Sequence, residues 1–251
     1  GQFEINWTYA DALTTADRHA FFKVMVKAMA EQQGLRASFM AKPFAALTGN
    51  GCHTHLSLWS SAGCNLFHDP AGELGLSALA YQFIGGLIAH APALCAITNP
   101  TVNSYRRLAA PPTTSGATWS PGGISYTGNN RTHMVRIPDD QRLELRLPDG
   151  SAHPYLLQAA ILAAGLDGIG RQLDPGPRRD NDNYAQPLGL DACQRLPADL
   201  GEALDAFAAD TALRQGLGEE FCQSYERLRR RQWQRERGDI SDAERRACLD
   251  C

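Results

Sequence analysis

The chain has 251 residues, of which 43% are apolar, and 24 Lys and Arg against 27 Asp and Glu leave a formal net charge of −3. This length allows a substantial hydrophobic core, and we expect one domain over residues 1–251 because no repeat or linker divides the chain. The near-neutral charge argues against a dedicated nucleic-acid binder, and no apolar run approaches the length that spans a membrane.

The chain contains seven cysteines at scattered positions. An odd number without a secretory leader favours free thiols in a reducing cytosol, so we expect a cytoplasmic protein. The first residue is Gly1 rather than Met, and a structured pattern follows at once, so we expect a piece of a longer protein. The one CxxC pair, Cys248 to Cys251, leaves open a metal-binding or redox role beside that of a frayed tail.

The first elements are a strand and a helix. Residues 2–7 alternate between polar and apolar side chains, which predicts a half-buried strand. Residues 14–33 are typical of an amphipathic helix that Thr14 or Thr15 caps and Gly34 ends. We expect the buried face of this helix to consist of Phe21, Met25, Ala28 and Met29.

The stretch TGNGCHTHLS, residues 48–57, places two histidines one position apart after a loop with two glycines. Because side chains alternate along a strand, His53, His55 and Ser57 share one face, and Cys52 lies on the other. An HxH pair alone is usually no ligand site, but two imidazoles and a hydroxyl in a row suit a metal or a phosphate. A strand follows the glycine loop, so it is neither a P-loop nor a dinucleotide fingerprint.

The middle of the chain predicts a buried helix over residues 76–91 that ends before Pro92. Residues 99–121 are rich in Pro, Ser, Thr and Gly, and we expect a long irregular segment with a functional role there. Two alternating strands follow at residues 132–138 and 142–149.

The last third of the chain is expected to be helical. Residues 153–169 predict a second buried helix with Pro154 near its start. From about residue 175 the sequence is polar and helical. Its basic stretch RLRRRQWQRERG fits a solvated helix face better than a nucleic-acid site, because acidic neighbours dilute the charge.

Carboxylate and imidazole side chains on the expected strands suit a hard divalent cation. Glu4, His53 and Glu144 would form a carboxylate-rich site with one imidazole, which fits Mg²⁺ or Mn²⁺ beside phosphate better than Zn²⁺. Each residue alone has a plainer explanation, since a glutamate on a strand is usually solvated.

Arginine is the second chemical signal. A guanidinium group is permanently charged and bidentate, so a cluster fits carboxylates and the phosphates of a nucleotide. A single arginine more often forms a surface ion pair of small energetic value. The arginines that lie among the metal-type ligands are Arg107, Arg131, Arg136, Arg142 and Arg146.

Five motifs occur along the chain in the order GQFEI, KPFAALTGNGCHTHLS, NPTVNSYRRL, NNRTHMVRIP and LELRLPDGSAHPYL. In order and spacing they resemble the catalytic domain of the glutamine synthetase family over essentially the whole chain. The resemblance implies an α+β fold, with a curved antiparallel sheet flanked by helices, and ring-shaped homo-oligomers such as a dodecamer, with active sites at subunit interfaces. It also implies an ATP-dependent ligase of nitrogen metabolism and glutamine biosynthesis, which converts glutamate to γ-glutamyl phosphate and then to an amide.

The resemblance implies a role for each candidate residue. Glu4 would bind the first of two or more Mg²⁺ or Mn²⁺ ions, and His53 and Glu144 would bind the second. The ATP-binding residues would be His55, Ser57, Arg131, Arg136 and Arg142. Glutamate would be bound by Arg107, Arg146 and the backbone of Gly49. The catalytic residues would be Arg131, which stabilises the transferring phosphoryl group, and Arg107.

Some positions depart from the family. Thr48 replaces an Asn that contacts glutamate, and the loop near Thr113 lacks the Glu that helps to bind and deprotonate ammonium. The sequences TGNGCH and TTSGATWSP resemble the type III branch of the family, which includes γ-glutamylmethylamide synthetases. Methylamine or another amine is therefore an alternative to ammonia. Tyr184 falls near a tyrosine that is adenylylated in some bacterial members, although its surroundings differ.

Two further expectations concern activity. The small N-terminal domain of the family and its upstream acidic ligands lie outside these 251 residues, so we expect the chain alone to be inactive and to bind metal weakly. A non-catalytic structural relative is a third alternative. The intact ligand residues and arginines argue against it, because a scaffold needs none of them.

Overall fold

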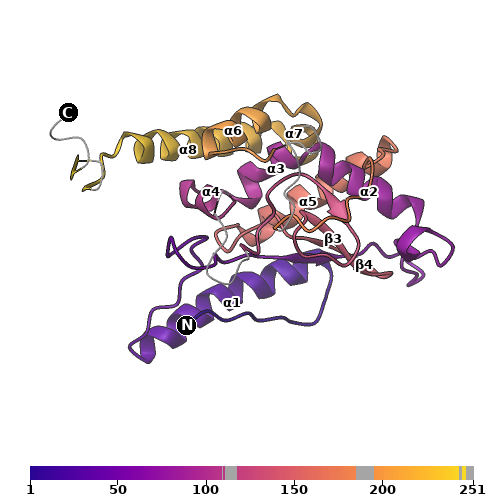
Figure 1. Ribbon diagram of the computed structural model, residues 1–251, viewed down its shortest axis with the longest axis horizontal. Coiled ribbons are helices and arrows are strands. Elements are labelled where there is room, and N and C mark those ends of the chain that lie inside the picture. Colours follow the sequence, from indigo (N-terminus) through magenta and orange to yellow (C-terminus); the bar gives the residue numbers. More distant parts are fainter. Residues whose placement is uncertain (109, 111–117, 185–194, 243–244, 247–251) are drawn as a thin grey trace.

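The structure is a computed structural model that describes residues 1–108, 110, 118–184, 195–242 and 245–246. The architecture is α+β, as expected, with helices packed around one sheet (Figure 1). The helices are α1 (Ala12–Gln32), α2 (Ala78–Ala89), α3 (Ala91–Thr98), α4 (Val102–Leu108), α5 (Pro154–Gly170), α6 (Leu200–Ala209), α7 (Thr211–Leu217), α8 (Glu219–Gly238) and the short 3-10 helix η1 (Glu73–Gly75). The strands are β1 (Thr54–Leu56), β2 (Tyr126–Thr127), β3 (Val135–Asp139) and β4 (Arg142–Leu145).

The sheet has the strand order β1-β4-β3-β2. β4 pairs antiparallel with both β1 and β3, whereas β2 runs parallel to β3, so the sheet is mixed rather than wholly antiparallel. β3 and β4 form a hairpin in which the Asp139 carboxylate accepts a hydrogen bond from the backbone N–H of Gln141 at 3.0 Å. A register shift between Arg136 and Asp139 separates this turn from the pair Arg136 and Glu144, which lie opposite each other further along the two strands.

Helices α2 and α5 form the centre of the core, and both are confirmed near their expected positions. Their backbones approach closely because glycines face each other across the contact. A Cβ atom built on Gly86 would lie less than 3.0 Å from the carbonyl oxygen of Ala164, and one on Gly168 would collide with the backbone at Gln82 and Gly86. The absence of side chains at these two positions therefore decides how near the helices come.

The N-terminal segment differs from the expectation. Residues 2–7 form no strand, and Phe3 is 89% exposed. Helix α1 is confirmed, but Asp11 caps it, and the expected buried face, which includes Phe21 and Met29, is exposed. The side chains of α1 that are buried belong to Ala16 and His19. Phe22 packs against Trp7 and Phe39, whereas nothing in the described residues covers the exposed side chains of Phe21 and Met29.

The segment expected to be irregular is partly helical. The apolar run continues beyond α2 into α3, because His90 only bends the chain and Pro92 fits the first turn of a new helix. Val102–Leu108 then forms α4, and residues 111–117 lie outside the described residues. Thr113 is among these.

Helices α6 to α8 lie on the side of the molecule opposite α1, with the sheet and α5 between them, and α8 extends beyond the body (Figure 1). Among the residues that the structure describes, the first helix after Gly170 begins at Leu200, later than expected. Cys248, Cys251 and the rest of the CxxC stretch lie outside the described residues. In the described part of the chain no single helix is long and apolar enough to cross a membrane, and α2 with α3 meets that test only as a pair bent by 75°.

Candidate functional site

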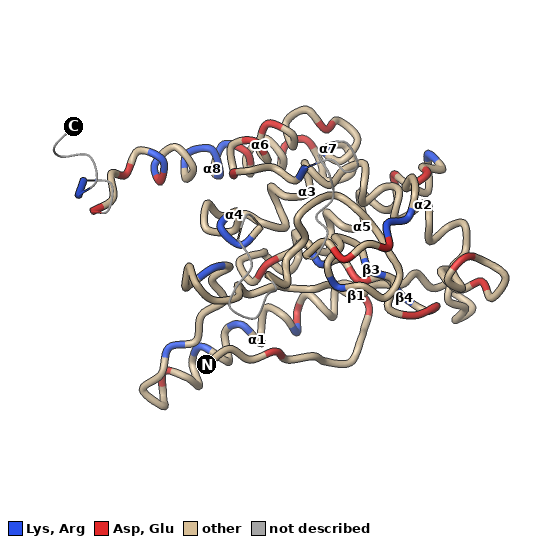
Figure 2. The backbone as a smooth tube through the Cα atoms, in the orientation of Figure 1, with Lys and Arg blue, Asp and Glu red and all other residues tan. Residues whose placement is uncertain are grey.

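Strand register builds the candidate site. His55 on β1 lies opposite Glu144 on β4, and Glu144 lies opposite Arg136 on β3. Residues that pair directly across antiparallel strands point to the same face, so these three side chains form one row. Arg146 stands two positions from Glu144 and joins the row. Figure 2 shows acidic and basic positions close together around β3 and β4.

The carboxylate of Glu144 is the centre of this row, and its side chain is only 3% exposed. It accepts hydrogen bonds from Arg136 Nη1 at 2.7 Å and from Arg146 Nη1 at 2.6 Å. His53 Nδ1 and His55 Nε2 lie 3.5 and 3.7 Å from Glu144 Oε1. We refer to these five residues as the Glu144 cluster.

His53 presents a nitrogen that is suited to binding a cation. Burial lowers the pKa of His53 to about 2, and the positive charges of Arg146 and Arg107 act in the same direction, so the ring is neutral. Its Nε2 atom is buried and has no hydrogen-bond partner among the described residues. A Cβ atom at Gly51 would lie 2.6 Å from this Nε2, so glycine at position 51 leaves the space beside the nitrogen unfilled.

His53 and Glu144 are thus two ligand side chains that fit a divalent cation, one a neutral imidazole and the other a carboxylate. Glu4 does not join them. It is exposed, and its carboxylate accepts a hydrogen bond from Asn6 at 3.4 Å. The described residues contain no group of three or more His, Cys, Asp or Glu side chains arranged to hold a metal. The described residues alone therefore do not form a complete cation site.

Arg107 lies beside the cluster on α4 and is 2% exposed. Its guanidinium donates to the carbonyl oxygens of Leu147 at 2.9 Å and Arg146 at 3.1 Å, which ties α4 to the end of β4. Gly49 packs against the Arg107 side chain, and a Cβ atom there would lie 2.5 Å from the carbonyl oxygen of Ala41. Burial lowers the pKa of Arg107, partly offset by Asp149, but the group remains a cation at any physiological pH.

The other candidate residues line the outer part of the site. Arg142 donates from Nε to His55 Nδ1 at 3.1 Å and forms an ion pair with Asp139 at 2.9 Å. The hydroxyl of Ser57 accepts a hydrogen bond from Trp59 at 2.9 Å. Arg131 is exposed, and its charge contributes to the lowered pKa of His53.

Two residues with a part in the site were not found by sequence reasoning. Asn129 accepts hydrogen bonds from Arg136 Nε at 2.9 Å and Nη2 at 2.6 Å, and so orients that guanidinium. Gln2 donates to the carbonyl of Gly49 at 3.0 Å and to Asn50 Oδ1 at 2.8 Å, which ties the N-terminal segment to the glycine loop. The motifs NNR and GQFEI contain both residues, but neither spacing nor residue type indicates these contacts.

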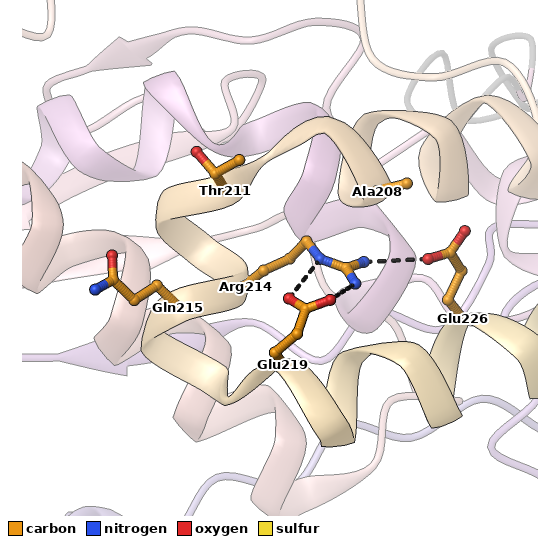
Figure 3. A pocket seen from close by; sticks show the side chains of 6 residues that line it. All are labelled: Ala208, Thr211, Arg214, Gln215, Glu219 and Glu226. Carbon is orange, nitrogen blue, oxygen red and sulfur yellow. Dashed lines mark hydrogen bonds and ion pairs between the residues drawn. The ribbon is translucent and has the colours of Figure 1, made fainter.

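A separate pocket lies between α6, α7 and α8, lined by Ala208, Thr211, Arg214, Gln215, Glu219 and Glu226 (Figure 3). Arg214 dominates it and binds the carboxylates of Glu219 and Glu226. The hydrogen bonds that Arg214 donates to Glu219 raise the pKa of Arg214 further. Both carboxylates belong to α8, so these ion pairs join α7 to α8 and leave the arginine little capacity to bind a ligand.

Comparison with known proteins gives the family. The model "Glutamine synthetase, catalytic domain" matches residues 1–248. A glutamine synthetase of Rhizobium leguminosarum bv. phaseoli is 55% identical over 251 residues, and a glutamate–methylamine ligase of Methyloversatilis universalis is 46% identical over 255 residues. Each alignment covers 100% of this chain, but only 58% and 57% of the respective relative.

A solved complex of GmaS with ADP superimposes with a TM-score of 0.92 and 60% sequence identity, covering 98% of this chain and 56% of that chain. A ligand-free GmaS structure gives a TM-score of 0.90 and 57% identity. The chain thus spans little more than half the length of the relatives that it matches. It belongs to the glutamine synthetase family and corresponds to the catalytic domain of that family.

Proposed function

We propose that this chain is the catalytic part of an ATP-dependent ligase that joins glutamate to ammonia through γ-glutamyl phosphate. The Glu144 cluster is the observation that carries the proposal, because it combines cation ligands with arginines on one face of a sheet. Phosphoryl transfer depends mainly on such positioning and on neutralising charge. The family in general requires ATP and a divalent metal.

The arginines divide into two groups in this mechanism. Arg107 and Arg146 are buried and rigid, and they would bind the carboxylates of glutamate next to the Gly49 backbone. Arg136, Arg131 and Arg142 are more exposed and would face the phosphates of ATP, with His55 and Ser57 beside them. Arg131 would stabilise the transferring phosphoryl group, where added positive charge lowers the barrier most.

His53 and the Glu144 carboxylate would hold a Mg²⁺ or Mn²⁺ ion, which when bound neutralises phosphate charge. Glu4 would be a ligand of another ion, but the structure leaves it exposed and away from this pair. We propose that residues outside this chain complete the cation sites, since the matched relatives are much longer. On this proposal the 251 residues alone are inactive.

A separate question is which amine the ligase uses. Relatives of comparable identity include proteins named as glutamine synthetases and one named glutamate–methylamine ligase, and the GmaS structures match the fold closely. Methylamine is therefore our second candidate for the amine that attacks γ-glutamyl phosphate. The Thr113 position, where the family's ammonium-binding Glu is missing, lies outside the described residues.

Members of the family use small-molecule substrates and are oligomeric. We propose a ring-shaped homo-oligomer with active sites at the subunit interfaces. The apolar side chains exposed on α1 and the segment before it support this, because large uncovered patches mark interaction surfaces. A cytoplasmic location is supported by the free thiols of the described cysteines, which are Cys52, Cys64, Cys95 and Cys222.

The test is release of phosphate from ATP by the complete protein with glutamate and, in turn, ammonium, methylamine and longer amines. Glutamate-dependent phosphate release that requires Mg²⁺ or Mn²⁺ would support the ligase, and the amine with the highest kcat/KM would identify the product. A complete protein that binds ATP but never releases phosphate would show that the chain is a non-catalytic relative.

A further inference from the structure

The segment from Arg178 to Tyr184 is firmly attached to the sheet beside the candidate site. Thr127 on β2 donates to Asp180 at 3.2 Å, and His133 and Asn130 bind the carbonyl oxygen of Asn181 at 2.8 and 3.0 Å. The Nδ2 atom of Asn183 donates to the carbonyl oxygen of Thr132 at 3.1 Å, and its backbone N–H donates to the Thr132 hydroxyl at 3.1 Å. Five hydrogen bonds thus fix this segment of seven residues to β2 and to the residues before β3.

The anchored segment ends at Tyr184, whose phenol has an unusual environment. Its hydroxyl oxygen is buried and has no hydrogen-bond partner among the described residues. Leaving a buried hydroxyl unpaired is unfavourable, and such groups are rare in folded proteins. An orphaned hydroxyl held in place by a rigid segment therefore points to a partner that binds there.

Other orphaned atoms lie around the same place. The described residues contain four buried side-chain nitrogen or oxygen atoms without a partner, and His53 Nε2 and Arg146 Nε are two of the others. The phenol of Tyr184 is close enough to Arg107 and Arg146 that its ionised form would raise the pKa of both. A Cβ atom built on Gly51 would contact both His53 Nε2 and Arg107 Nη2, so the unpaired imidazole nitrogen also lies near Arg107. An imidazole nitrogen, a guanidinium N–H and a phenol without partners therefore all lie near these two arginines.

We propose that the Tyr184 hydroxyl donates a hydrogen bond to the carboxylate of the substrate that Arg107 and Arg146 bind, and so contributes to the specificity for that substrate. The inference rests on the proposed function, because it requires a carboxylate between these arginines. A phenol donates well to a carboxylate oxygen, and it adds direction to the charge that two guanidinium groups supply.

The experiment compares Tyr184→Phe with the unmodified complete protein, varying glutamate and ATP separately. We expect the KM for glutamate to rise about tenfold, since a hydrogen bond to a charged group is lost. The KM for ATP should stay within about twofold, and the melting temperature should not fall, because the hydroxyl has no partner within the protein to lose. Calorimetric titration with glutamate should show the same weakening.

Tyr155→Phe is the matched control. Its hydroxyl donates to Asp17 at 2.5 Å on the outside of the molecule, so its removal should leave both KM values unchanged. An unchanged glutamate KM in Tyr184→Phe would overturn the inference. So would a lower melting temperature with both KM values raised, which would mean that the hydroxyl binds another part of the protein. If the unmodified protein itself shows no glutamate-dependent phosphate release, the proposed function fails first, and the inference fails with it.

Discussion

At the scale of single residues, the Glu144 carboxylate is held between two guanidinium groups where water hardly reaches. Glu144→Gln would remove the negative charge and leave Arg136 and Arg146 facing each other, with Arg146 only 3% exposed. Breaking a buried ion pair from one side is costly, because the remaining charge is uncompensated. We expect the free energy of unfolding to fall by about 3 kcal/mol, measured by urea denaturation of this chain.

The control is Glu73→Gln. Glu73 binds Arg178 at 2.6 Å, but its side chain is 57% exposed, so the substitution should cost less than about 1 kcal/mol. Equal losses in the two variants would contradict the view that burial makes the Glu144 contacts strong.

At the scale of the helices, His90 lies between α2 and α3 and links them to the end of α5 and the start of α7. It binds Asp210, before α7, at 2.6 Å and Asp167, on α5, at 2.9 Å, and Arg171 binds Asp167 at 2.9 Å. Burial alone would lower the pKa of His90, but the hydrogen bonds with the two aspartates outweigh it, and the net effect raises this pKa above 6.5. Bonds from His90 and Arg171 likewise outweigh burial and lower the pKa of Asp167 below 3.8.

These shifts define a pH window for stability. The contribution of His90 is complete below pH 6.5 and is lost as the pH rises through the raised pKa of the folded protein. The contribution of Asp167 is complete above pH 3.8 and is lost as the pH falls through its lowered pKa. We expect His90→Asn to cost about 2 kcal/mol at pH 6 and distinctly less at pH 9, measured by urea denaturation across this range.

The control for this pH dependence is His68→Asn. His68 lies 3.3 Å from Asp140 at the surface, with 35% and 48% of the two side chains exposed. This exposed pair should contribute almost nothing, so the variant should follow the unmodified chain at every pH. A loss in His90→Asn that is the same at pH 6 and pH 9 would show that His90 stabilises the helices by packing alone.

The contact between α2 and α5 gives a second prediction at this scale. Gly86→Ala would place a methyl group less than 3.0 Å from the backbone of α5, so the helices must separate. We expect a loss of about 2–3 kcal/mol in the free energy of unfolding. Gly170→Ala is the control, since nothing lies within 4 Å of that position, and it should be neutral or slightly stabilising. Destabilisation by both substitutions would mean that the close approach is not what matters.

The sequence predicted those helices that a local pattern of apolar residues is enough to specify. Helices α2 and α5 are long, apolar and bounded by proline, and they lie near the expected positions. The prediction of a strand at residues 2–7 was wrong. Alternating polar and apolar side chains are typical of a strand, but they supply no partner for its backbone hydrogen bonds. The prediction of the buried face of α1 was wrong for a similar reason. Periodicity shows which side chains are apolar, but it does not show which face of the helix another element covers.

At the scale of the whole molecule, the candidate site could be predicted only in part. Alternation along one strand places His53 and His55 together, and the motifs pointed to the arginines. The pairing of Glu144 with Arg136 depends on the register of β3 and β4, which residue types do not reveal. The position of the segment that ends at Tyr184 depends on hydrogen bonds to Thr127, Thr132 and His133, which are far away in the sequence. No local pattern encodes such contacts.

The exposed apolar side chains give the last prediction, because most of the large ones lie between Phe3 and Leu47. Phe21 and Met29 on α1 are 66% and 58% exposed, which is unfavourable unless another copy or another part of the protein covers them. We expect the isolated chain to self-associate at micromolar concentration, and the double variant Phe21→Lys, Met29→Lys to be monomeric in analytical ultracentrifugation. Its free energy of unfolding should change by less than about 0.5 kcal/mol per site, since these side chains are exposed in the folded chain. Leu228→Lys, at an equally exposed position on α8, should not prevent association. An unmodified chain that stays monomeric would contradict the view that this face is an interface.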